Sequence, residues 1–419
     1  MQTNRRAFLK RAGALCAAPY LLPASAMAAN DKITVGSVGV GPQGRRVMEL
    51  FLASEDARVV AVCDVNALRL EDARRHVDAY YGEKGCAAYG DFRELIARPD
   101  IDVIHCATPD HWHVLVALEA ARAGKDMYIE KPLGLSLAED VALRKAVQAS
   151  GSVFQFGTQH RSERNFRFGC ELVRNGRIGK LHTMRVGLEA SKVALSFPAM
   201  PVPDWLDYDR WLGPAPWAPF TANRIINQYW WHISDYTLGF VAGQNIHFGD
   251  IAQWGNGTEL SGPIEIEGWG VFPRDGLCDC AIAYNVRHSY ANGVTMHFSD
   301  DVENPQGVRF EGTEGWVFVD LGFVDAEPKS LLHTLFEPGE ERLPVSTNHV
   351  QNLLDCVRTR AQPICPIEQA VRSDTICHLS DIAMRLGSRL EWDPEHERFV
   401  NDETANRMLT RAMRSPWRL

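Results

Sequence analysis

The chain has 419 residues, of which 45% are hydrophobic and 23% charged, so it is long enough for two folded domains of ordinary globular composition. Its formal net charge is −9, from 53 acidic and 44 basic side chains. Because no basic stripe accompanies this acidic balance, we expect no nucleic-acid partner.

The first residues have the composition of an export signal. Twin arginines at 5–6 precede a short, weakly apolar stretch at about 12–22, and small residues at 24–28 supply an A-x-A cleavage site. The alternative is a cytosolic helix that begins with arginines. We expect residues 1–28 to be a twin-arginine signal, read by the twin-arginine export machinery. The mature protein would then be periplasmic, and the apolar stretch is too short to leave a transmembrane span.

Residues 31–156 alternate apolar runs with helical patterns, which predicts a doubly wound parallel sheet of the α/β class. The predicted strands are 33–38, 59–63, 103–107, 127–130 and 152–156. The predicted helices are 66–81, 111–123 and a helix that a capping box at 136–139 opens and that ends near 151.

A glycine-rich turn, GVGPQG at 39–44, directly follows the first predicted strand, and Asp64 follows the second. Glycines permit a tight turn and close approach of a pyrophosphate, whose charge then meets the N-terminus of the next helix. A carboxylate at the end of the second strand can bind ribose hydroxyls and would repel a 2′-phosphate. The pattern predicts NAD, with NADP less favoured. The predicted cofactor contacts here are Gly39, Gly41, Pro42, Gln43, Gly44 and Asp64.

Residues 157–419 have a different pattern. A Trp- and Pro-rich segment at 201–231 precedes strand-like runs, and helical stretches follow at the end of the chain. We expect an α+β domain with a mostly antiparallel, open sheet that carries helices on one face. Strands are predicted at 264–267, 294–298 and 316–319, and helices at 167–176, 349–360 and 375–390.

Three motifs occur in order at the ends of successive predicted strands: GVGPQG at 39–44, TPDHWH at 108–113 and EKP at 130–132. Together they resemble the glucose–fructose oxidoreductase, inositol dehydrogenase and MocA-like (Gfo/Idh/MocA) family, most closely its secreted bacterial branch. Further similarity lies in WLGPAPW at 211–217 and FEGTEGW at 310–316.

The resemblance implies hydride exchange between a nicotinamide and a sugar or cyclitol carbon. It also implies a homo-oligomer, a dimer or tetramer, built on the open sheet. Thr108, Pro109 and His113 resemble the loop beside the nicotinamide ribose. Glu130 and Lys131 resemble the pair that faces the reacting centre.

Two residues are predicted to be catalytic. Lys131 can hydrogen-bond a substrate hydroxyl and help move its proton, although a surface lysine at a strand end is the alternative. His247 resembles the histidine of the family's second catalytic motif, which usually has an aspartate four residues earlier. That earlier position is Gly243 here, and Asp235 or Asp250 are the candidates to compensate.

The aromatic and polar stretch at 227–232 suggests a sugar-binding surface, since flat rings stack on the apolar faces of sugars. A structural cover over the sheet is the alternative. The predicted substrate contacts are Arg161, Tyr229, Trp230, His232, Asp235 and Asp250. No cluster has the ligand spacing of a metal site, so no metal is expected.

Three functions compete. The first is an NAD(P)-dependent oxidoreductase that transfers hydride between a tightly bound nicotinamide and a sugar, glycoside or polyol. The second is a redox-neutral, NAD-dependent enzyme that cleaves glycosides by transient oxidation and elimination. The third is a sugar sensor without catalysis, which the intact EKP motif at 130–132 disfavours.

Overall fold

The computed structural model describes residues 32–419, and the predicted signal at 1–28 lies outside them. That signal and the periplasmic location therefore remain predictions. Among the helices of the described residues, none combines the length and apolar character that a membrane crossing requires.

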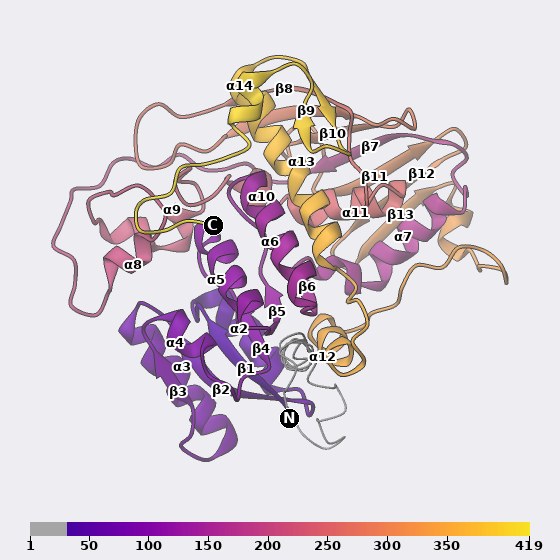
Figure 1. The fold of residues 1–419 in the computed structure, drawn as a ribbon. Coiled ribbons are helices and arrows are strands. Elements are labelled where there is room, and N and C mark those ends of the chain that lie inside the picture. Colours follow the sequence, from indigo (N-terminus) through magenta and orange to yellow (C-terminus); the bar gives the residue numbers. More distant parts are fainter. Residues whose placement is uncertain (1–31) are drawn as a thin grey trace, which may run out of the picture. The chain divides into compact units, whose positions relative to one another are not determined.

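The first sheet has six parallel strands in the order β3-β2-β1-β4-β5-β6 (Figure 1). Its central strands are buried on both faces, which explains their continuous apolar runs. The strand order reverses between β1 and β4, where a crevice opens at the carboxyl ends of the strands. The strands are β1 (Ile33–Val38), β2 (Ala57–Cys63), β3 (Ala87–Tyr89), β4 (Val103–Cys106), β5 (Asp126–Ile129) and β6 (Phe154–Phe156).

Five helices alternate with these strands: α2 (Pro42–Leu52), α3 (Ala67–Tyr81), α4 (Phe92–Ile96), α5 (Asp110–Arg122) and α6 (Leu137–Ser150). The predicted Rossmann fold is confirmed. The sequence pattern does not predict β3 or α4, because three and five residues are too short to show a period. The expected capping box does not form: the Ser136 hydroxyl caps no amide and donates to Glu139, which accepts from the Leu135 amide instead of the Ser136 amide.

The second sheet has nine strands in the order β13-β12-β11-β7-β10-β9-β8-β14-β15. Neighbours are antiparallel except for the β7–β10 pair, which confirms the mostly antiparallel prediction. Its strands are β7 (Leu181–Gly187), β8 (Glu265–Val271), β9 (Ala283–Ser289), β10 (Thr295–Ser299), β11 (Gly307–Gly312), β12 (Trp316–Asp320), β13 (Phe323–Glu327), β14 (Leu390–Asp393) and β15 (Arg398–Phe399).

Helices α7 (Arg164–Arg174), α11 (Ile246–Asn256) and α13 (Ile367–Leu386) pack against this sheet. Helix α13 begins at Ile367, before the predicted 375. The sequence pattern missed this start because the helix is buried nearly all round and shows no amphipathic stripe. The remaining helices are α8 (Tyr208–Leu212), α9 (Asn227–Trp230), α10 (Phe240–Gly243), α12 (His349–Thr359) and α14 (Glu403–Arg407), with 3-10 turns at Gln159–Ser162, Ala222–Ile225 and Lys329–His333.

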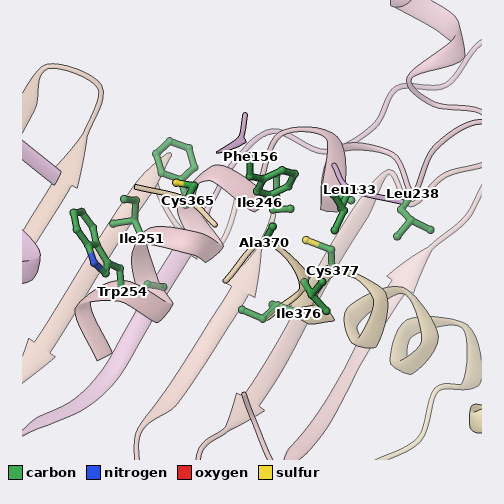
Figure 2. Packing of buried hydrophobic residues seen from close by; sticks show 14 of the residues in the cluster. Leu133, Phe156, Leu238, Ile246, Ile251, Trp254, Cys365, Ala370, Ile376 and Cys377 are labelled. Carbon is green, nitrogen blue, oxygen red and sulfur yellow. The ribbon is translucent and has the colours of Figure 1, made fainter. Parts of the chain in front are cut away.

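One hydrophobic core joins the two sheets. Leu133 and Phe156 come from the Rossmann part, and they belong to the same buried cluster as Ile246 of α11 and Cys377 of α13 (Figure 2). Because this core is continuous, the carboxyl end of the first sheet is held in a fixed relation to α10 and α11.

The Trp- and Pro-rich segment and the C-terminal tail return to the Rossmann part, beside α5 (Figure 1). The amide of Ala67 donates to the carbonyl of Trp205 at 2.8 Å. The ring of Trp417 packs edge-on against Trp112, with centroids 4.7 Å apart. Two segments far from the glycine turn in sequence thus cover the crevice.

A buried charged cluster supports the loop that follows β5. Asp374 of α13 accepts hydrogen bonds from the amides of Leu133 and Gly134 at 3.0 and 3.1 Å. The Nε2 atom of His378 lies 3.0 Å from Asp140 and 3.5 Å from Asp374. Burial opposes a charge on His378, but the two carboxylates outweigh it and raise its pKa to about 10. The polar side-chain atoms of Asp140, Asp374 and His378 lie within 4.8 Å of one another. These three side chains therefore interact with one another and with the loop after β5.

We predict that His378→Gln lowers the free energy of unfolding by about 3–5 kcal/mol, because it leaves buried carboxylates without their cation. The folded-state pKa of His378 lies above its ordinary value of 6.5, so its contribution is fully present below pH 6.5 and is lost as pH rises toward 10. Denaturant unfolding across that pH range measures both effects.

His396→Gln is the matched control, because His396 is exposed and bonds only to Asp393 beside it. If His378→Gln and this control showed the same stability and the same pH dependence, the assignment of a charged His378 would be wrong.

Candidate active site

The glycine turn between β1 and α2 has no room for side chains at two positions. Gly39 has a φ of +78°, and a Cβ there would lie 2.6 Å from the Thr108 nitrogen. A Cβ on Gly44 would lie 1.8 Å from the Gly39 carbonyl oxygen. Gly41 precedes Pro42, the first residue of α2, whose fixed φ suits that position. The free amides of this helix end therefore face the crevice, as an anion requires.

Asp64 is fixed at the end of β2 by backbone amides. Its Oδ2 accepts from the amide of Val40 at 3.0 Å, and its Oδ1 accepts from the amide of Asn66 at 2.8 Å. Burial raises the pKa of Asp64, while these amides and the Arg69 guanidinium oppose the rise. Each carboxylate oxygen keeps a lone pair for a ribose hydroxyl.

A single cleft gathers the predicted cofactor residues. It is lined by Gly39, Gly41, Pro42, Gln43, Asp64, Thr108, Pro109, His113, Glu130 and Lys131, and Gly44 lies in the same turn. The covering segments add Arg210, Trp211, Trp230, Trp231 and Trp417, and α10 adds Gly243. A glycine cradle, a helix N-terminus and a fixed carboxylate in one cleft fit a dinucleotide.

Glu130 and Lys131 join this cleft to the second half of the chain. The buried Glu130 carboxylate accepts from Gln43 and Gln159 at 2.9 and 3.0 Å. Burial raises the pKa of Glu130, which Lys131 and these amides oppose. The Lys131 ammonium donates to the carbonyl of Gly243, the last residue of α10. The lysine thus spans from the end of β5 to α10.

His113 borders the cleft but bonds to the backbone. Its Nδ1 lies 2.6 Å from the Pro132 oxygen, and its Nε2 lies 2.9 Å from the Thr108 oxygen. Burial lowers the pKa of His113 to about 4, so the ring is neutral and donates to one of these oxygens. The contact ties the Thr108 loop to the segment that carries Lys131.

His247 lies on α11 and is not among the residues that line the cleft. Its ring stacks on His160, with centroids 4.5 Å apart, and its Nδ1 has no hydrogen-bond partner. Burial, then the neighbouring His160 and Lys131, lower its pKa well below the usual value. A neutral imidazole near Lys131 is therefore present, but it does not line the cleft.

Arg161 and Asp250 do not reach the cleft. Their side chains are almost wholly buried and form a two-point ion pair, with both N–O distances 2.6 Å. The Ser373 hydroxyl also donates to Asp250 at 2.6 Å. Asp235 borders a separate cavity beside Asp381. Neither candidate therefore replaces the missing carboxylate at Gly243.

Of the predicted aromatic contacts, Trp230 lines the cleft. Tyr229 packs against Phe197, with centroids 5.3 Å apart, and the His232 ring lies against Phe240 at 4.8 Å. Burial lowers the pKa of His232 to about 4. The stretch at 227–232 is thus divided between the cleft and the covering layer. Trp417 was not predicted, because no local pattern indicates where the chain end packs.

Gly243 leaves open space. A Cβ there would meet only the Thr237 hydroxyl, at 3.9 Å, and its φ is not in the left-handed region. Gly243 lines the cleft, and a side chain there would meet no backbone and cause no strain.

We predict that Gly44→Ala abolishes the retention of nicotinamide dinucleotide, because its Cβ would displace the Gly39 carbonyl and distort the turn. The nucleotide released from denatured protein measures this. Gly85→Ala is the matched control, since its Cβ would meet nothing within 4 Å, and it should retain the wild-type amount. Full retention by Gly44→Ala would contradict the assignment of the cradle.

Two family models match the chain. Residues 33–158 match an oxidoreductase family domain with an NAD-binding Rossmann fold, and residues 190–419 match an oxidoreductase family C-terminal alpha/beta domain. Both belong to the GFO_IDH_MocA group that the motifs resemble.

Curated relatives match shorter parts. A glycosyl hydrolase family 109 protein of Saccharopolyspora erythraea is 40% identical over 117 residues, 27% of this chain and 26% of that protein. A myo-inositol 2-dehydrogenase of Thermotoga maritima is 31% identical over 152 residues, 36% of this chain and 44% of that enzyme. The chain thus matches less than half the length of either relative.

Solved structures share the fold over most of the chain. The WlbA dehydrogenase from Bordetella pertussis, in complex with NADH and UDP-GlcNAcA, has a TM-score of 0.65 at 17% identity and covers 87% of this chain and 99% of its own. An aldose-aldose oxidoreductase from Caulobacter crescentus, complexed with glycerol, has a TM-score of 0.62 at 20% identity and covers 86% and 100%.

Proposed function

Because the chain belongs to the Gfo/Idh/MocA oxidoreductase family, we propose that it transfers hydride between a tightly held nicotinamide dinucleotide and a hydroxyl carbon of a sugar, glycoside or polyol. The observation that carries this proposal is the Lys131 ammonium, which lies in the same cleft as the glycine cradle. The family's relatives include a myo-inositol 2-dehydrogenase, which acts on a polyol.

The dinucleotide supplies the hydride chemistry when bound, and the residues of the chain orient it and move the proton. Asp64 would bind the ribose hydroxyls, and the amides at the start of α2 would bind the pyrophosphate. Lys131 would hydrogen-bond the substrate hydroxyl and help to move its proton as the carbon is oxidised. The tryptophans of the covering segments would exclude water from the cleft.

We favour NAD over NADP. The fixed Asp64 carboxylate would repel a 2′-phosphate, but the Arg69 guanidinium lies beside it. Denaturing purified protein and quantifying the released NAD(H) and NADP(H) distinguishes the two. Candidate sugars and polyols, added to the intact protein, would change the nicotinamide absorbance if the proposal is correct. No bound dinucleotide and no absorbance change with any such compound would refute it.

We predict that Lys131→Met lowers kcat by about 10²–10⁴-fold, because it removes the proton-handling group, while the bound dinucleotide stays at the wild-type level. Steady-state kinetics and nucleotide content measure the two effects. Lys84→Met, at an exposed loop lysine, is the matched control and should keep the wild-type kcat. An unchanged kcat in Lys131→Met would favour a sugar sensor without catalysis.

A second candidate is redox-neutral cleavage of a glycoside by transient oxidation and elimination. The identity to a glycosyl hydrolase family 109 protein favours it, and so does the missing carboxylate at Gly243. Release of a free sugar from an aryl glycoside, without lasting reduction of the nicotinamide, would identify this reaction.

We further propose that the protein is exported through the twin-arginine pathway with its dinucleotide already bound, and that it assembles as a homo-oligomer through the open sheet. Fractionation of the producing cells and light scattering of the purified protein test these two proposals. Protein confined to the cytoplasm, or a monomer in solution, would contradict the respective proposal.

A further inference from the structure

Asp110 is a buried carboxyl group in the cleft to which the proposed function assigns no role. It is the first residue of α5, its exposed fraction is 3%, and it borders the cleft together with Lys131 and Gly243. Asp110 belongs to the TPDHWH motif at 108–113, in which the family resemblance implies roles only for Thr108, Pro109 and His113.

The Asp110 carboxyl differs from the other acidic groups that border the cleft. Asp64 bonds to two amides, Asp91 pairs with Arg93 at 2.6 Å, and Glu130 accepts from two glutamine side chains. Among the described residues that line the cleft, Asp110 is the acid with a buried oxygen, Oδ2, that has no hydrogen-bond partner. Buried polar atoms are nearly always satisfied, so an unsatisfied one indicates a group kept for a ligand.

A purely structural role at the helix end does not account for this carboxyl. A first-turn acid stabilises a helix through the macrodipole, which requires ionisation but no burial. Here burial raises the pKa of Asp110 to about 7, against the opposing effects of the Thr237 hydroxyl and the Lys131 ammonium. The other charged group whose field reaches it is Asp374 on α13, which raises the pKa further, and His113 on its own helix is neutral.

The structure describes both Lys131 and Asp110. Their charges interact, but the two side chains form no direct ion pair. Thr237 marks the same corner of the cleft, because its hydroxyl oxygen is the atom nearest to a Cβ at Gly243, at 3.9 Å. That oxygen already accepts from the Gly239 amide at 3.0 Å, so its hydrogen is available to Asp110. Because both groups border the cleft, a substrate hydroxyl bound there can meet an ammonium and a carboxylate.

We propose that Asp110 is a second catalytic residue, which binds the substrate hydroxyl opposite Lys131 and shares the proton that this hydroxyl loses. The inference rests on the proposed function, because it names the proton acceptor of that same site. Asp110 thus supplies a carboxylate to the cleft. Gly243 has none, and neither Asp235 nor Asp250 reaches the cleft.

The proton step balances within the chain. A proton of the Lys131 ammonium passes to the Asp110 carboxylate, which breaks an N–H bond and forms an O–H bond. The O–H bond of the substrate then breaks, and its proton restores the N–H bond on Lys131. The electron pair of the broken C–H bond leaves with the hydride to the oxidised nicotinamide that the proposed function names.

Asp110→Asn tests the role, because asparagine keeps the size of the side chain and removes its proton affinity. We expect kcat to fall about 10²–10⁴-fold with little change in bound dinucleotide. In the wild type, the rate of oxidation should rise with pH through about 7, since the ionised carboxylate is the acceptor, and this rise should vanish in the variant. Glu403→Gln is the matched control, an exposed first-turn acid of α14 that should leave both the rate and the pH profile unchanged.

The double variant Asp110→Asn with Gly243→Asp provides a rescue, since a side chain at 243 enters the same corner. Partial recovery of kcat would support a carboxylate acceptor. Carbon-13 NMR of labelled aspartate gives a readout without turnover: a carboxyl resonance that titrates near neutrality should be present in the wild type and absent in Asp110→Asn.

A wild-type kcat and pH profile in Asp110→Asn, or the lack of such a resonance in the wild type, would overturn the assignment. Failure of the proposed function is distinguishable, because the wild type itself would then transfer no hydride from any sugar or polyol. The NMR titration would still report on Asp110 in that case.

Discussion

The hydrogen bond from the Lys131 ammonium to the Gly243 carbonyl is the contact on which the site depends. It joins the carboxyl end of β5 to the end of α10, where the helix leaves its last carbonyls without helical partners. In the cleft, the two halves of the chain thus meet at this charged group.

The segment that carries this ammonium is held by buried charged groups, which bond to side chains and amides. Glu130 bonds to Gln43 of the glycine turn, so the cradle and the lysine share one support. Asp374 fixes the loop after Lys131, and the charged His378 offsets its carboxylate. Such groups are costly when unpaired in a low-dielectric interior, and their pairing makes the geometry of this loop rigid. Among the described acids that line the cleft, Asp110 stands apart, because its buried Oδ2 has no hydrogen-bond partner.

The sequence predicted the positions of residues well where position follows from local pattern. In a parallel sheet, the residue that ends a strand lies at the crevice, so a motif after an apolar run already has a position. The glycine turn, Asp64, Thr108 and Lys131 were found in this way, and they line one cleft. It worked less well for Arg161 and Asp250, since a sequence does not show that two distant charges pair with each other in the core.

The sequence by itself determined the Rossmann sheet, the mostly antiparallel second sheet and the glycine turn that lines the cleft, because short-range periodicity and strand ends carry that information. Only the tertiary structure decided which side chains cover the cleft, as Trp417 does from the chain end, and which carboxylates remain available there. It also decided that His247 is neutral and stacked on His160. The physical reason is that burial and charge pairing depend on contacts between segments far apart in the chain, which no local pattern records.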